Sequence, residues 1–91
     1  MSHGAPSVDI GVFASWLHKA DQNVEKWGLQ DEETLLLAMQ EELGELTQAH
    51  LEARAEDGDP DRVDEEMDDL GALLLQLHMA RDGVEVSELV Q

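Results

Sequence analysis

The sequence predicts an all-α protein, a helical bundle of three main helices and a short C-terminal fourth helix, completed by oligomerisation. Three segments carry apolar residues at spacings of three and four, which is the periodicity of a helix with one buried face. An aspartate that can cap a helix lies at the start of each segment. No stretch alternates apolar and polar residues as a half-buried strand does, so the sequence predicts no sheet.

The amino-acid composition excludes several classes of protein. The 91 residues include 22 acidic and five basic side chains, which gives a formal net charge of -17. A chain this acidic lacks the basic patch that nucleic-acid binding needs, and no apolar run is long enough to span a membrane. There is no cysteine, so disulfides and thiolate metal sites are excluded. We expect one small cytoplasmic domain, and domains of this size often add metal or a second subunit to a modest core.

The first eight residues show no periodicity, so we expect a flexible leader over 1–8 and one helical domain over 9–91. Asp9 or Ser7 can cap the first helix, and Gly28 ends it. Trp16 lies in the middle of the apolar stripe, where a core position is expected. Trp27 lies at the end of the helix, where stacking on a nucleobase and packing in the core are equally good interpretations. The stripe comprises Val12, Phe13, Trp16, Leu17, Ala20, Val24 and Trp27.

The second helix begins after the cap Asp31 and runs to about Ala55. Its main stripe is formed by Leu36, Met39, Leu43, Leu46, His50 and Ala53, and it is widened by Leu35, Leu37 and Leu51. This breadth predicts a central helix that is contacted on more than one side, including by a partner subunit. His50 lies on the stripe, which favours an interior or interface histidine over a metal ligand.

The third helix begins at Asp59-Pro60, because aspartate is a good cap and proline is favoured at the first helical position. It ends near Arg81, and Gly83 follows. Residues 84–91 are expected to form a connector and one further turn, the short fourth helix. The stripe of the third helix comprises Val63, Met67, Leu70, Leu73, Leu74 and Leu77.

Acidic residues cluster on the second and third helices, and their positions relative to the apolar stripes differ. At 100° per residue, Glu66 falls inside the stripe of the third helix and Asp69 on its edge, whereas Asp68 falls on the solvent side. Glu42 lies at the edge of the stripe of the second helix, with Glu45 and Glu41 beyond it. An inward carboxylate without a partner costs several kcal/mol. A hard divalent cation would satisfy it, and the alternative is that these acids only solvate the surface.

The two clusters also resemble the motifs of the MazG-like all-α nucleoside triphosphate pyrophosphatases, EExxE followed by ExxD. Glu41-Glu42-Leu43-Gly44-Glu45 matches the first motif and Glu66-Met67-Asp68-Asp69 the second, with 20 residues between them. The run Lys26-Trp27-Gly28, the segment 35–40 and the leucine-rich end of the third helix are also similar to this family. The resemblance covers residues 13–81.

The resemblance implies hydrolysis of a nucleoside triphosphate between its α and β phosphates, which clears non-standard or excess nucleotides. It implies that Glu42, Glu45, Glu66 and Asp69 hold Mg²⁺, for which Mn²⁺ can substitute, and that Glu41 binds a further metal or positions the attacking water. The sequence departs from the family in its short C-terminal part and in its few basic residues. No motif matches a basic residue of this chain to a phosphate. The basic residues are Lys19, Lys26, Arg54, Arg62 and Arg81.

The leading hypothesis is therefore a Mg²⁺-dependent nucleoside triphosphate pyrophosphohydrolase, active as a homodimer or a homotetramer, without nucleic-acid or membrane partners. One alternative is a non-catalytic helical interaction module whose acids are an adaptation to salt. A second is a nucleotide sensor that keeps the metal site and has lost turnover.

Overall fold

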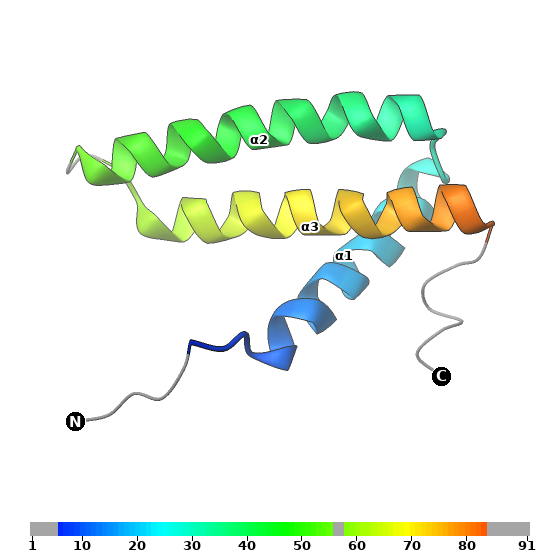
Figure 1. Ribbon diagram of the computed structural model, residues 1–91, viewed down its shortest axis with the longest axis horizontal. Coiled ribbons are helices and arrows are strands. Elements are labelled where there is room, and N and C mark those ends of the chain that lie inside the picture. Colours follow the sequence, from blue (N-terminus) through cyan, green and yellow to red (C-terminus); the bar gives the residue numbers. More distant parts are fainter. Residues whose placement is uncertain (1–5, 56–57, 84–91) are drawn as a thin grey trace.

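The computed structural model describes residues 6–55 and 58–83, and it confirms the all-α fold. The helices are α1 (Ile10–Trp27), α2 (Glu32–Arg54) and α3 (Pro60–Asp82), and there is no strand among these residues. Helices α2 and α3 lie side by side and antiparallel, and α1 crosses α3 obliquely (Figure 1). The predicted fourth helix and residues 1–5 of the predicted leader lie outside the described residues, and residues 6–9 have no regular structure. None of the described helices has the length and hydrophobicity to cross a membrane.

The helix limits agree with the capping residues in the sequence. Asp9, Asp31 and Asp59 precede the three helices, and the carboxylate of each accepts a backbone N–H bond of 2.7 to 2.9 Å. These bonds satisfy amide groups that have no partner within the first helical turn. Gly28 and Gly83 end α1 and α3 at φ angles of 77° and 67°, which side chains with a Cβ rarely adopt.

The central helix of the chain is α3, not α2 as the broad apolar stripe predicted. Helix α3 packs against both α2 and α1, whereas α1 and α2 make no backbone-level contact within the described residues. The broad stripe of α2 therefore remains partly exposed, at Leu36, Leu37, Leu43 and Leu51. His50 is also exposed in the single chain, so an interior position for it is wrong. Its place in an interface stays a prediction.

The buried core is small for a chain of this length. Its hydrophobic members among the described residues are Ala20, Leu35, Ala49, Ala72 and Met79. Ala20 and Ala72 are fully buried where α1 meets α3, because small side chains allow two helices to approach closely. A core in which three of five members are alanine buries little apolar surface.

Trp16 joins α1 to α3 through its whole indole ring. The ring lies against Gly71 in α3, and its N–H donates a hydrogen bond of 3.1 Å to Asp68 Oδ1. Asp68 is therefore half-buried, which corrects the solvent position that the helical wheel predicted for it. The reason is that α1 covers a second side of α3, and the apolar stripe of α3 alone does not reveal this crossing.

Two glycine substitutions are expected to change stability in opposite directions. A Cβ at Gly71 would overlap the ring of Trp16, so Gly71→Ala should lower the free energy of unfolding by about 1–3 kcal/mol. A Cβ at Gly44, in the middle of α2, meets no atom within 4 Å. Gly44→Ala should therefore raise the free energy of unfolding by about 0.5–1 kcal/mol. Urea unfolding of both variants and of the natural chain measures the two changes in free energy of unfolding. If both substitutions changed it by the same amount, the packing of α1 on α3 would be contradicted.

Candidate metal centre

Three carboxylates from two helices converge where α2 and α3 pack together. Glu42 and Glu45 come from α2 and Glu66 from α3, and one oxygen of each lies within 4.8 Å of the others. Glu42 and Glu45 share a face because they are three residues apart on a helix. The antiparallel neighbour α3 then supplies Glu66 from its apolar stripe. Three of the four predicted metal ligands are thus brought together.

Two oxygens of this cluster are buried without a partner. Neither Glu42 Oε2 nor Glu66 Oε2 has a hydrogen-bond donor in reach among the described residues. The side chain of Glu66 is only 13% exposed, whereas Glu45 is exposed. Buried polar atoms are almost always hydrogen-bonded, so such a pair needs a proton or a cation. Carboxylate oxygens at this spacing suit Mg²⁺, Mn²⁺ or Ca²⁺, which prefer oxygen ligands.

The acid–base behaviour of Glu42 reflects the same crowding. Several causes together raise the pKa of Glu42 from 4.5 to about 7, and burial is the largest of them. The second cause is the adjoining Glu66 carboxylate, because two carboxylates share a hydrogen bond only when one holds a proton. The negative charges of Glu45, Asp69 and Glu66 act in the same direction. A divalent cation would replace that proton and stabilise all of these charges.

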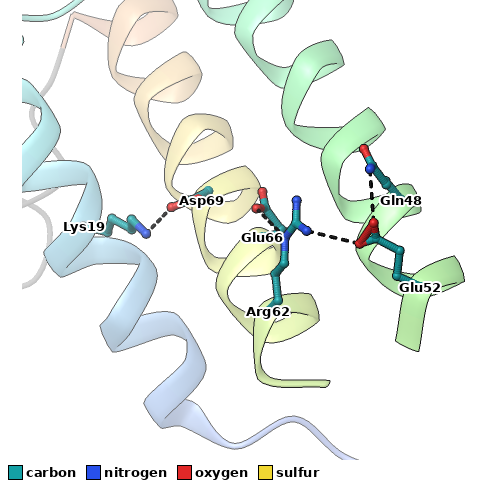
Figure 2. A network of polar contacts seen from close by, with 6 residues as sticks. All are labelled: Lys19, Gln48, Glu52, Arg62, Glu66 and Asp69. Atoms are coloured by element: carbon teal, nitrogen blue, oxygen red, sulfur yellow. Dashed lines mark hydrogen bonds and ion pairs between the residues drawn. The ribbon is translucent and has the colours of Figure 1, made fainter. Parts of the chain in front are cut away.

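The fourth predicted ligand, Asp69, lies beside the cluster but is turned toward α1. Its charge acts on Glu42, and both residues line one pocket. Its carboxylate forms an ion pair with the ammonium group of Lys19, as Figure 2 shows. Both side chains are partly exposed, at 38% for Lys19 and 33% for Asp69. Asp69 is not among the three converging carboxylates, and its role as the fourth metal ligand stays a prediction.

A second cation, Arg62, approaches the cluster from the other side. Its Nε lies 3.9 Å from Glu66 Oε1, and its guanidinium also pairs with Glu52 of α2 at 3.2 Å (Figure 2). Gln48 donates a hydrogen bond of 3.2 Å to the other oxygen of Glu52. Arg62 of α3 is thus shared between Glu52 of α2 and Glu66. Glu66 keeps one weakly paired oxygen and one that has no partner among the described residues.

Glu41 is exposed and does not belong to the group of three converging carboxylates. It precedes Glu42 on α2, so it lies about 100° around the helix from that ligand. The proposed role of Glu41 toward water or a further metal stays a prediction.

A pocket of about 500 Å³ lies between the three helices, and of the three converging carboxylates Glu42 lines it. Lys19, Glu42 and Asp69 line one end. Further along the helices the pocket is lined by Trp27, Gln30 and Thr34. Its apolar wall is formed by Leu35, Ala38 and Leu73. From Glu42 to Thr34 the helix rises about 12 Å, so the pocket is elongated with one charged end. Its volume is within the range of small-molecule sites.

The sequence did not reveal two polar residues of this pocket, Asn23 and Gln76. Gln76 is 3% exposed and accepts a hydrogen bond of 2.8 Å from the Asn23 amide. Gln76 lies outside the apolar stripe of α3 and is buried only because α1 covers it. Trp27 lines the pocket as the hypothesis of base stacking requires, although it is 62% exposed, and Lys26 lies 4.7 Å from its ring centre.

Comparison with protein-family models, with curated proteins and with solved structures finds no match to this chain. The functional interpretation therefore depends on the motifs and on the site itself.

Proposed function

We propose that this chain is a Mg²⁺-dependent nucleoside triphosphate pyrophosphohydrolase of the cytoplasm that removes non-standard or excess nucleotides. The observation that carries the proposal is the group Glu42, Glu45 and Glu66, in which two buried oxygens lack a partner among the described residues. Glu42 of this group also lines the charged end of an elongated pocket. The reaction adds water across the α–β anhydride and yields a nucleoside monophosphate, pyrophosphate and a proton.

The converging carboxylates fit Mg²⁺ because all donors are oxygens, and two of these oxygens have no partner in the part of the chain that the structure describes. Glu42, Glu45 and Glu66 would hold the metal, and Asp69 would join them. Bound Mg²⁺ neutralises phosphate oxygens and lowers the pKa of water. Glu41 lies next to these ligands on α2, and we assign it the positioning of the attacking water.

The shape of the pocket supports one orientation of the substrate. Phosphates would lie at the end formed by Lys19, Glu42 and Asp69, and the nucleoside would extend toward Trp27. The apolar wall suits the faces of a base, and the Asn23–Gln76 amide pair offers polar groups to its edge. An anionic triphosphate would enter a chain of charge -17 only with cations, which explains the need for metal.

A panel of ribonucleoside and deoxyribonucleoside triphosphates tests the proposal. We expect release of pyrophosphate with Mg²⁺ or Mn²⁺, none with EDTA, and a monophosphate as the second product. Orthophosphate as the first product would contradict cleavage between the α and β phosphates. Metal-dependent nucleotide binding without pyrophosphate would instead identify a sensor.

We further propose that the chain acts as a homodimer, with the homotetramer as the alternative assembly. An apolar groove of about 540 Å³ runs along α2 and α3. Among the described residues that line it, only Trp16 and Gln40 carry a polar group in the side chain. Leu36, Leu43, Met67 and Leu74 line it and are 42% to 53% exposed. Two such α2–α3 pairs, related by a two-fold axis, would form a four-helix bundle. A second copy is favoured over other partners because the core of a single chain is so small.

Leu43→Asp is expected to convert the dimer to a monomer and to lower its melting temperature, because the charge would enter a dry interface. Leu37→Asp is the matched control, since Leu37 is equally exposed on α2 but does not line the groove. Light scattering coupled to size-exclusion chromatography measures the mass. A natural chain that is monomeric at all concentrations would overturn the dimer.

A further inference from the structure

Lys19 is the one cation among the described residues that line the pocket. The other cations with described partners do not line the pocket. Arg81 pairs with Glu32 at 3.2 Å, Lys26 lies over Trp27, and Arg62 pairs with Glu52 and with Glu66. Lys19 therefore occupies a position that no other basic residue shares, between a predicted metal ligand and the space for a substrate.

We propose that Lys19 is an exchangeable cation, which pairs with Asp69 in the metal-free protein and with substrate phosphate once Asp69 becomes a ligand. The inference deepens the proposed function and rests on it. It assigns to one residue two successive partners, both of them anions at the same end of the pocket.

The ion pair between Lys19 and Asp69 is suited to such an exchange. Both side chains are partly exposed, and ion pairs in contact with solvent are weak, so little is lost when the pair opens. Asp69 cannot give the same lone pairs to Lys19 and to a divalent cation. In the metal-free state Lys19 therefore competes for one predicted ligand of the centre.

The released ammonium group remains at the charged end of the pocket. Lysine carries a point charge and three donors on a flexible stem, which allows it to follow phosphate oxygens over several ångströms. Asp69 would then bind the metal, so a triphosphate becomes the next anionic partner of Lys19. Lys19 thus offsets negative charge first on the protein and then on the substrate.

The exchange predicts effects of opposite sign for one substitution. Lys19→Gln removes the competitor for Asp69, so Mn²⁺ alone should bind about two- to five-fold more tightly. The same variant loses a phosphate contact, so a triphosphate analogue with a non-hydrolysable α,β bridge should bind about ten-fold more weakly at saturating Mg²⁺. Lys19→Arg keeps the charge and should retain most of the analogue affinity. A purely structural lysine would not change the two affinities in opposite directions.

Calorimetric titration of Mn²⁺, and of the analogue in Mg²⁺, measures both quantities. Arg81→Gln is the matched control, because it removes the same charge and an ion pair with Glu32, and neither affinity should change. Tighter Mn²⁺ binding with unchanged analogue affinity would overturn the exchange, as would the absence of both effects. A natural chain that binds no Mn²⁺ would overturn the metal centre as well. A natural chain that binds the analogue but releases no pyrophosphate refutes only the proposed reaction.

Discussion

Glu42→Gln is expected to abolish the response to Mg²⁺ and yet to raise the melting temperature of the metal-free chain. The carboxylate of Glu42 is repelled by Glu45, Asp69 and Glu66. One of its oxygens is buried and has no partner within residues 6–55 and 58–83. Replacing it with a neutral amide relieves this repulsion, so the metal-free variant should melt a few degrees higher at pH 8. The amide is a poor ligand for a divalent cation, so pyrophosphate release should fall by about 100-fold or more.

Metal-dependent stability gives a readout that does not require turnover. The natural chain should gain about 2.7 kcal/mol when Mg²⁺ is present at 100 times its dissociation constant, and Glu42→Gln should gain little. Glu65→Gln is the matched control, because Glu65 is exposed on α3 beside Glu66 and its replacement changes the net charge equally. The metal centre would be refuted if Glu42→Gln were less stable than the natural chain without metal and still gained the full stability from Mg²⁺.

Features that depend on one helix were predictable from the sequence. The aspartate caps and terminal glycines act within one turn, so they placed the three helices within about two residues. Glu66 was identified because an acid inside a leucine stripe must meet another helix or a cation. The contact of Arg62 with Glu66 was also predictable, since the two residues are four positions apart on one helix.

Features that depend on how α1 crosses α3 were not predictable. The apolar stripe of α3 gives one buried side, but α3 is covered on two sides. The contacts of Lys19 with Asp69, Trp16 with Asp68 and Asn23 with Gln76 all lie on the second side. These contacts depend on the angle at which α1 crosses α3. Small residues such as Ala20 and Ala72 allow the two helices to approach closely, but they do not determine this angle.

The stability of the metal-free chain is expected to fall as the pH rises from 5 to 8. The pKa of Glu42 is about 7 in the folded chain, against 4.5 for an ordinary glutamate such as that of the unfolded chain. Between these values the folded chain binds more protons than the unfolded chain, so each increase in pH favours unfolding. Thermal melts in EDTA measure the trend. Mg²⁺ competes with the proton, so its stabilising effect should increase over the same range.

The variant Glu42→Gln separates this titration from the general charge of the chain. The variant keeps 21 of the 22 acidic residues, so it retains the general repulsion among them. Its advantage over the natural chain should therefore be large at pH 8 and vanish near pH 5, where Glu42 is already protonated. Asp31 does not contribute to the change of stability between pH 5 and 8, because hydrogen bonds from Thr34 lower its pKa below 3.8. An advantage that is constant from pH 5 to 8 would show that the charge of Glu42 is not what destabilises the metal-free cluster.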